Sequence, residues 1–332
     1  GDVDACVGIS GPVVAINDAL DPEIDVLITG HTHLPYNCVL PDADGKPRIV
    51  TSSYSFGRVV TDINLVIDKA SKDVRRDLST ATNHVVARDE LSPDPAITAV
   101  IDKWQPLFDV AGNTPIGTIT ADINRGGDPT GSDRGVESAA GNLVADAQLW
   151  ATSANGADIA FMNPGGVRSD LTFLSSQDPP EGDGVVTFGE AFTFQPFGNT
   201  LKTFPMTGAE IVSALEEQCQ PAGSSRPFLH LGVSEGFTYD LSTTIEDIGG
   251  VNTCTGISIT DVQLNGVAIS PTASYEVTVN SFLSDGGDNF GTFDTITAPK
   301  LDGGVDLEAL TNYLGTFGPV APPPTDRVNE AP

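Results

Sequence analysis

The sequence predicts a protein of the α/β or α+β class rather than a helical bundle. Its 332 residues include 35 glycines and 24 prolines, a composition that implies many turns and short elements. Residues 11–20, GPVVAINDAL, place apolar side chains at helical spacing, and a continuous β-branched run, IDVLITG, follows at 24–30. This order of helix, buried strand and polar loop is typical of an α/β layer, in which sites lie beyond the carboxyl ends of strands.

The next segments extend this prediction along the chain. Residues 48–68 alternate between apolar and polar side chains and predict two or three sheet strands. Residues 92–108 begin with a Ser/Pro/Asp cluster and continue at helical spacing. We expect this helix to connect two domains, the second of which begins near residue 113.

The second domain is predicted to be mixed as well. GVESAAGNLVADAQLWATSA (135–154) predicts a helix, and residues 157–171 a strand followed by a glycine turn. Residues 188–219 predict a turn, a strand pair and a helix that begins at TGAE. Further strands are expected at 227–241, 255–268 and 275–280. The tail PVAPPPTDRVNEAP is Pro-rich, and we expect it to be disordered.

Composition and charge exclude several classes of function. With 39% apolar and 18% charged residues, the chain can bury an ordinary core. The formal charge of −29 repels nucleic acid and anionic lipid, so neither is expected as a partner. A small anionic ligand remains compatible, because salt screens charges over about 8 Å and local arginines then dominate. No apolar run approaches the roughly 20 residues that span a bilayer.

The four cysteines fall as an early pair and a late pair, with no CxxC motif that would indicate a zinc knuckle. Two local disulfides, Cys6–Cys38 and Cys219–Cys254, fit an acidic protein of an oxidising compartment. Buried free thiols are the alternative. The chain starts with Gly and has no basic-then-apolar leader, so a mature product or a fragment is expected.

Two of the four histidines, His31 and His33, directly follow the predicted buried strand. Alternate side chains of an extended segment face the same way, so the two imidazoles could reach neighbouring ions such as Zn, Mn, Fe or Co. An HxH pair by itself is also typical of loop histidines that only form hydrogen bonds. The pair is therefore a candidate metal site whose other ligands have to come from elsewhere.

Two double-glycine loops follow: NPGGVRSD supplies Asn163, Gly165, Gly166 and Arg168, and NSFLSDGGDNF supplies Phe282, Gly286, Gly287 and Asp288. Paired glycines let the backbone come close to a ligand or adopt positive φ. A guanidinium matches phosphate, and a carboxylate can accept hydrogen bonds from two vicinal hydroxyls. Phosphate and ribose together describe a nucleotide, whereas structural turns with surface charges are the alternative.

Three further features could complete such a site. Phe197, in FQPFGN, and Phe282 could stack on a base, although most of the fifteen phenylalanines must be core residues. Arg134 lies just before the helix at 135–154, whose N-terminus favours anions. Glu137 is expected to complete the cap of this helix, and Asn142 to pack or form hydrogen bonds on it.

The order of these motifs is more specific than any one of them. GHTH, ESAAGNLVADA, NPGGVRSDL, GEAFTFQPFGN, FTYDL and NSFLSDGGDNF, in this order, resemble the 5'-nucleotidase family of secreted two-domain metallophosphoesterases. The resemblance covers residues 24 to about 315. It implies the C-terminal part of a four-layer α/β/β/α metallophosphoesterase domain at 1–85, a linker with a helix at 86–112, a mixed α/β substrate-binding domain at 113–320, and a tail at 321–332.

The resemblance also implies a binuclear metal site. GHTH matches its last ligand segment, so that His31 would bind one divalent ion and His33 the other, with zinc, manganese or similar metals as cofactors. The family's remaining ligands and its catalytic His lie upstream, and none precedes residue 24. TNHVV, with Asn83 and His84, lies downstream and is interpreted as strand or linker. We therefore expect a truncated chain that holds its metals incompletely.

For the second domain, the resemblance implies residue roles. Phe197 and Phe282 would stack the base, Asn163 would contact it, Asp288 would accept the ribose hydroxyls, and Arg134 and Arg168 would contact the ribose side and the phosphates. The expected function is hydrolysis of nucleoside 5'-phosphates outside the cytoplasm (secreted, periplasmic or cell-surface), with this chain keeping nucleoside recognition but inactive alone. A 2',3'-cyclic-nucleotide phosphodiesterase, a nucleotide-sugar hydrolase and a non-catalytic extracellular nucleotide-binding module are the alternatives. The sequence does not indicate an oligomeric state.

Overall fold

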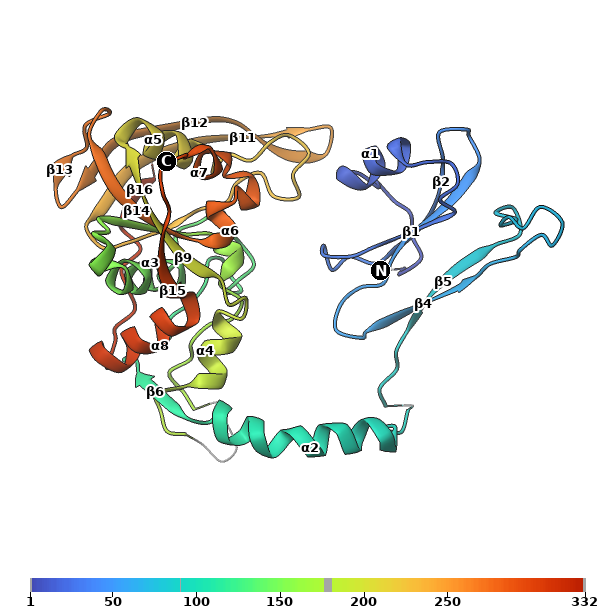
Figure 1. Ribbon diagram of the computed structural model, residues 1–332, viewed down its shortest axis with the longest axis horizontal. Helices are drawn as coiled ribbons and strands as arrows, with labels where there is room; N and C mark the ends of the chain where they lie inside the picture. Colours follow the sequence, from blue (N-terminus) through green and yellow to red (C-terminus); the bar gives the residue numbers. More distant parts are fainter. Residues whose placement is uncertain (1, 90, 176–180, 331–332) are drawn as a thin grey trace. The chain divides into compact units, whose positions relative to one another are not determined.

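The computed structural model describes residues 2–89, 91–175 and 181–330, and the chain divides into two compact units, Gly1–Ile101 and Asp102–Pro332. The division falls within the long helix α2, Pro95–Gly112 (Figure 1). This helix was expected at residues 92–108. Both units mix helices with sheets of mixed strand direction, so the chain has the mixed α/β fold predicted from the sequence.

Before α2, the described part of the first unit has a helix, a three-stranded sheet and a hairpin. Helix α1 is Pro12–Ala19, and the sheet has the order β1-β3-β2, with β1 and β3 parallel and β2 antiparallel to β3. The strands of the sheet are β1 (Val26–Thr29), β2 (Tyr36–Pro41) and β3 (Pro47–Ser52), and those of the hairpin are β4 (Val59–Asn64) and β5 (Thr80–Val85). The helix and strand predicted at 11–30 are thus α1 and β1, but the predicted burial of the strand is wrong, since Ile28 is 70% exposed.

A buried arginine fastens α1 to the sheet. The Arg48 side chain is fully buried in β3 and donates hydrogen bonds to the carbonyl oxygens of Asn17 (2.7 Å), Asp21 (2.9 Å) and Ile24 (2.7 Å). These carbonyls belong to the last turn of the helix and the turn after it, which would otherwise be buried without donors. Arg48 therefore offsets the partial negative charge at the end of α1 and holds the turn that leads into β1.

A five-stranded sheet organises the second unit, in the order β10-β7-β14-β9-β15. Only β7 and β14 run parallel; the other neighbouring pairs are antiparallel. Its strands are β7 (Ile159–Met162), β9 (Thr200–Thr207), β10 (Gly232–Val233), β14 (Ser274–Asn280) and β15 (Leu301–Val305). Two smaller sheets complete the unit: β6 (Pro115–Thr118) with β8 (Val185–Thr187), and β13-β12-β11-β16, formed by β11 (Phe237–Ile248), β12 (Val251–Leu264), β13 (Val267–Ala268) and β16 (Val328–Glu330).

Two hydrophobic cores lie against this sheet. One packs α3 (Ala139–Ala151) and α8 (Asp306–Phe317) around residues such as Leu143 and Leu310, and the other packs α5 (Gly208–Glu216) around Phe161 and Phe204. The short elements are α4 (Phe188–Phe194), α6 (Ser281–Ser284), α7 (Gly291–Thr295), and the 3₁₀ turns η1 (Ser153–Asn155), η2 (Pro164–Gly166) and η3 (Gly287–Asn289) (Figure 1). Apolar burial on both faces of the sheet holds the unit together.

A pair of strands was predicted within residues 188–219, and the first of these two strands is wrong. GEAFTF forms helix α4, because Thr187 and Glu190 make a capping box in which each side chain accepts from the other's backbone N–H. The start of α5 at TGAE was predicted correctly, and Thr207 and Glu210 form a second capping box there.

The predicted disorder of the tail is also wrong for the part up to residue 330. Strand β16 pairs in parallel with β11, and Arg327 is 7% exposed. Its guanidinium donates to both carboxylate oxygens of Asp146 on α3, at 2.7 and 2.8 Å. Glu137 accepts from the backbone N–H of Arg327 (3.2 Å) and from the Asn142 side chain (2.7 Å). Glu137 was expected to complete the cap of this helix, but its carboxylate binds the tail and Asn142 instead. The N-cap of α3 is Ser138.

Both predicted disulfides are present. Cys6–Cys38 closes the first unit between its N-terminal segment and β2, and Cys219–Cys254 joins the end of α5 to β12. The alternative of buried free thiols is thereby excluded. Across the described ranges, no helix is both long and apolar enough to cross a bilayer.

Candidate functional site

The histidine pair lies in the first unit at the carboxyl end of β1, as the sequence predicted. Strand β1 ends at Thr29, and His31 and His33 follow on an exposed loop with φ of 69° and 57°. Positive φ is uncommon for residues other than glycine, although Asn, Asp and His adopt it more often than most, so this loop has a specific backbone conformation. The His33 ring meets Phe56 edge-on, with the ring centroids 5.3 Å apart.

These two imidazoles form only part of a metal-ligand set. No group of three or more His, Cys, Asp or Glu side chains suited to a metal ion occurs among residues 2–89, 91–175 and 181–330. The Asn83–His84 pair adds no ligand, since Asn83 is buried in β5, where its side chain donates to the Val3 carbonyl (2.9 Å) and its N–H to Asp4 (2.8 Å). The strand interpretation of this pair is confirmed, and the donor set does not fit a complete binuclear site.

The two glycine loops of the second unit come together through a chain of hydrogen bonds. Asn163 follows β7 and is 3% exposed. Its amide nitrogen donates to Oδ2 of Asp288 (2.9 Å), and its amide oxygen accepts from Asn280 (3.0 Å) at the end of β14. Asp288 has φ of 54° within η3, and its carbonyl accepts from Gln220 (3.0 Å). One buried amide thus holds the Asp288 carboxylate, and a second holds the backbone of the same residue.

Arg134, Arg168 and Asp288 converge on Gly165. A Cβ added at Gly165 would lie 3.1 Å from a guanidinium nitrogen of Arg134 and 3.3 Å from Oδ2 of Asp288. The Arg168 guanidinium donates to the Gly165 carbonyl (3.3 Å) and lies 5.7 Å from the centre of the Phe197 ring. Glycine at position 165 therefore lets both charged groups lie close to the backbone, because a side chain there would displace them slightly.

The second loop positions Phe282 in a similar way. A Cβ at Gly287 would lie 2.5–2.6 Å from three carbons of the Phe282 ring, and Gly286 has φ of 79°. A Cβ at Gly166 of the first loop would collide with Met162. Phe282 is 44% exposed and Phe197 is 57% exposed, so neither ring is a core residue. Both rings are available to a ligand, and each adjoins one of the glycine loops.

The site concentrates positive charge in a strongly acidic protein. Burial lowers the pKa of Arg134, and the neighbouring Arg226 and Arg168 lower it further, while Asp288 acts in the opposite direction. Arg226 was not identified from the sequence, since SSRPF carries no recognisable motif. The rarity of cations, 16 in 332 residues, was the only signal that could have indicated it.

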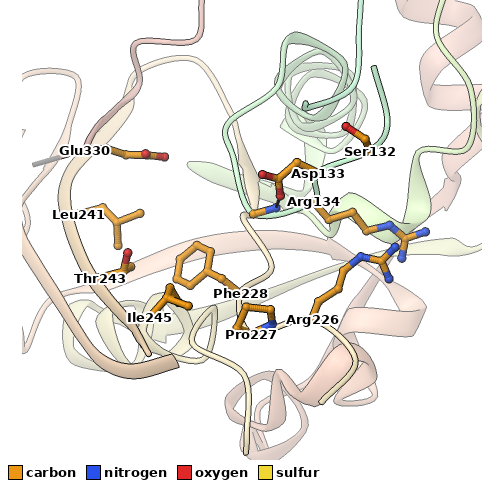
Figure 2. Close-up of a pocket in the computed structure, with 11 residues that line it drawn as sticks. Ser132, Asp133, Arg134, Arg226, Pro227, Phe228, Leu241, Thr243, Ile245 and Glu330 are labelled. Carbon is orange, nitrogen blue, oxygen red and sulfur yellow. Dashed lines mark hydrogen bonds between the residues drawn. The ribbon is translucent and has the colours of Figure 1, made fainter. Parts of the chain in front are cut away.

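Arg134 and Arg226 also line a cavity of about 290 Å³ (Figure 2). The view shows their guanidinium groups close together, with Phe228 between the arginines and the β11 residues Leu241, Thr243 and Ile245. The sequence-predicted residues of the second unit thus fall into one neighbourhood, linked through Arg134, Arg168, Asn163 and Asp288. The histidine pair belongs to the other unit.

A mixed α/β unit that presents two exposed rings, an oriented carboxylate and clustered arginines from separate loops has the features of a nucleotide-binding domain. Residues 115–295 match the model of a protein family described as 5'-nucleotidase, C-terminal domain, which is more than half of the sequence. The chain belongs to the 5'-nucleotidase family.

Similar proteins come from bacteria and animals. The chain is 31% identical over 306 residues to the cell wall protein Lmo0130 of Listeria monocytogenes, covering 89% of the chain and 36% of that protein. It is 28% identical over 318 residues to the trifunctional nucleotide phosphoesterase protein YfkN of Bacillus subtilis, covering 92% and 20%. A solved 5'-nucleotidase precursor from Thermus thermophilus is 25% identical, with a TM-score of 0.58, covering 92% of this chain and 59% of that one. The chain thus spans less than two thirds of the length of each of these relatives.

Proposed function

We propose that the second unit binds the nucleoside part of a nucleotide, within a protein that hydrolyses nucleoside 5'-phosphates. The observation that carries this proposal is the hydrogen-bonded placement of Asp288 beside Arg134 around Gly165. A carboxylate only accepts, so it suits the two ribose hydroxyls, and a guanidinium suits the phosphate on the same ribose. Phe197 and Phe282 would take the two faces of the base.

Asn163 has a more specific role in this proposal than the one expected from the resemblance. Its side chain is nearly fully buried, and both of its amide atoms are used by Asp288 and Asn280. With only 3% of Asn163 exposed, little of its side chain is open to a direct contact with the base. We therefore assign Asn163 as a positioning residue, which sets the orientation of the ribose-binding carboxylate.

His31 and His33 would contribute one ligand each to two divalent ions, completed by groups outside the described residues. Such ions polarise a phosphate and activate water as a nucleophile. Because the histidine loop by itself supplies two imidazoles, we propose that this chain tested alone binds nucleosides but hydrolyses AMP no faster than background. An extracytoplasmic location is supported by the two disulfides and by the similarity to a cell wall protein.

Calorimetric titration with adenosine, AMP and UMP tests the binding proposal. Asp288→Ala removes the ribose acceptor, and Phe282→Ala removes one stacking ring, worth about 1–3 kcal/mol per stacked base. Each variant is expected to weaken adenosine binding by about tenfold or more. Asp294→Ala, which removes a carboxylate from the next helix, serves as the charge-matched control. Unchanged adenosine affinity in both site variants would refute the assignment.

A phosphate-release assay with added manganese or zinc tests the catalytic part. The chain is expected to release phosphate from AMP at the rate of the metal-only blank. Turnover at rates of about 1 per second or more, lost in His31→Ala, would show that the chain completes its own metal site and would contradict the proposal.

A further inference from the structure

A cavity of about 390 Å³ lies beside β15, the edge strand of the five-stranded sheet. The end of α3, the turn η1, strand β15 and the first half of α8 form its walls (Figure 1). None of the described residues that line it belongs to the nucleoside site, and strands β14 and β9 lie between β15 and β7, after which Asn163 follows. Its volume is within the range of ligand pockets, roughly 300–1,000 Å³. The nucleoside site therefore does not account for this cavity.

A pair of glycines forms a bulge in β15 where the strand lines the cavity. The register with β9 shifts by one residue between Asp302 and Val305, so that Gly303 and Gly304 form the bulge. Gly303 lies close to the end of α3, since a Cβ added there would lie 2.4 Å from Cγ2 of Thr152, and Gly304 has φ of 84°. A bulge leaves its extra residue unpaired, and an edge strand has open N–H and C=O groups. Backbone hydrogen-bonding groups are therefore available at the cavity.

Two polar side chains of α8 also line the cavity. Glu308 and Asn312 are four residues apart, which places them on the same face of the helix. Both are exposed, and within the described part of the chain neither the carboxylate of Glu308 nor the amide of Asn312 forms a hydrogen bond or an ion pair. No lysine, arginine or histidine occurs among the described residues of the wall. The wall therefore offers acceptors and an amide donor, but no cation to balance an anionic ligand.

Trp150, near the end of α3, adds an aromatic ring to the wall. The ring is half-buried and meets two rings of α8 edge-on, with centroid distances of 6.0 Å to Tyr313 and 5.7 Å to Phe317. These contacts hold the indole in place and leave part of it accessible. The face of an aromatic ring carries negative potential and attracts C–H groups, which are weakly positive. A held indole beside unpaired hydrogen-bonding groups suits a ligand that has an apolar face and a polar rim.

We propose that this cavity binds a neutral sugar ring. The C–H face of the sugar would lie on the indole of Trp150, and its hydroxyl groups would donate to Glu308 and exchange hydrogen bonds with the Asn312 amide. The backbone of the glycine bulge would bind a further hydroxyl. An acidic or phosphorylated sugar is disfavoured, because its charge would face Glu308 in a protein of charge −29. The proposal does not depend on nucleotide binding or hydrolysis, because it uses none of the residues assigned to them.

A cation is the other class of ligand that a tryptophan and a carboxylate attract. Aromatic cages for quaternary ammonium groups surround the cation with several rings, whereas among the described residues Trp150 is the only ring of this wall. Such a ligand also has no groups that pair with the Asn312 amide or with the backbone of the bulge. The arrangement therefore favours a polyhydroxylated ligand, and choline serves as the probe that separates the two classes.

Tryptophan fluorescence is the direct test, because the chain has two tryptophans, Trp104 and Trp150. In Trp104→Phe, which alters an exposed residue of α2, Trp150 is the only indole. Cellotriose, maltotriose and chitotriose are titrated separately, and at least one is expected to shift the emission of this variant and to protect it from acrylamide quenching. Trp150→Phe, in which Trp104 reports instead, is the matched control and should show neither effect. No response of Trp104→Phe to any of the three sugars would overturn the proposal.

Calorimetry with the responding sugar tests the polar contacts. Glu308→Ala and Asn312→Ala each remove a hydrogen-bonding group and should weaken binding about threefold or more. Glu246→Ala and Asn252→Ala remove an exposed carboxylate and an exposed amide from the hairpin of β11 and β12, and should bind as the unaltered chain does. Thermal melting checks that each variant is folded. Equal affinity in the two cavity variants and the two controls would overturn the placement of the sugar.

Glu308→Gln and choline separate a sugar from a cation. Glutamine still accepts hydrogen bonds from hydroxyl groups, so this variant should bind the sugar within about threefold of the unaltered chain, whereas a cation would lose its counter-charge. Choline binding that is lost in Glu308→Gln, without any response to sugar, would show a cation site and overturn the proposal. Glucose identifies the source of the sugar: affinity equal to that of the trisaccharide indicates a free monosaccharide, and affinity at least about tenfold weaker indicates a glycan chain.

Discussion

The histidine loop of the first unit and the glycine loops of the second differ in how their functional side chains are held. His31 and His33 are exposed on a loop, and the ring contact of His33 with Phe56 is the only interaction that fixes either imidazole among the described residues. Asp288, in contrast, is fixed by Asn163 and Gln220, both nearly fully buried. The two histidine side chains are therefore not oriented by hydrogen bonds, whereas Asp288 is.

This difference bears on what each unit can do by itself. Recognition of a ligand benefits when the binding groups are held in place beforehand, because less conformational entropy is lost on binding. Metal binding by two exposed imidazoles lacks both the additional ligands and the orienting hydrogen bonds that metal sites use. The second unit should therefore bind its ligand whether or not the histidine loop is intact.

The largest expected effect is on the free energy of unfolding of the second unit. Arg327→Ala leaves the Asp146 carboxylate buried without its partner, at 9% exposure, and should lower the free energy of unfolding of this unit by about 3–5 kcal/mol. Arg75→Ala breaks an exposed pair with Asp77 in the first unit and should cost less than about 1 kcal/mol. Urea unfolding measures both. If Arg327→Ala lowers the free energy of unfolding as little as Arg75→Ala does, the ion pair of the tail does not stabilise the second unit.

A smaller effect is expected on the pH dependence of stability. Burial lowers the pKa of His230 from 6.5 to about 4, so the folded chain binds this proton more weakly than the unfolded chain. The resulting stability is present above pH 6.5 and is lost as the pH falls towards 4, by about 2 kcal/mol between pH 7.5 and 5. His230→Gln should lack this contribution, while the neighbouring Glu330 titrates in both chains. Identical losses in the two proteins would contradict the burial of a neutral imidazole.

The hydrogen bond that orients Asp288 should contribute measurably to adenosine affinity. Asn163→Ala removes the donor to Asp288 and should weaken adenosine binding by about tenfold, with AMP affected alike, because both share the ribose. Asn155→Ala removes a similar amide whose bond to the Asp302 carbonyl lies on the surface, and it should leave binding unchanged. If Asn163→Ala binds adenosine normally, the carboxylate does not depend on this amide.

The smallest effect is expected from the histidines. The double variant His31→Ala, His33→Ala should bind adenosine within about twofold of the unaltered chain, since the loop belongs to the other unit and the nucleoside needs no metal there. Calorimetry in the presence of a chelator gives the matched comparison. A large loss of adenosine affinity would show that the two units do not act independently in recognition.

Much of the fold could be predicted because local patterns were consistent with it. The helix at 11–20, the strand at 24–30 and the capping motif TGAE each carried their own signals, and the structure has α1, β1 and α5 there. GEAFTF was misassigned because its aromatic residues favour strands, and the capping box at Thr187 outweighed that preference. The tail was misassigned because its order depends on Arg327 reaching Asp146, 181 residues away.

The candidate site was predictable only as a set of residue types. The glycine loops and their charged residues were visible in the sequence, whereas the bond between Asn163 and Asp288 joins positions 125 residues apart. Arg226 has no local pattern at all, and its importance arises from its distance to Arg134 in the folded chain. Long-range convergence of this kind leaves no trace in the local spacing of residues.

A crystal structure of the chain with bound adenosine would show whether the nucleoside site is correctly assigned. We expect the base between the rings of Phe197 and Phe282, and the ribose hydroxyls within hydrogen-bond distance of the Asp288 carboxylate, about 2.5–3.0 Å. Adenosine bound elsewhere, or bound with Asp288 turned away from the ribose, would contradict the assignment.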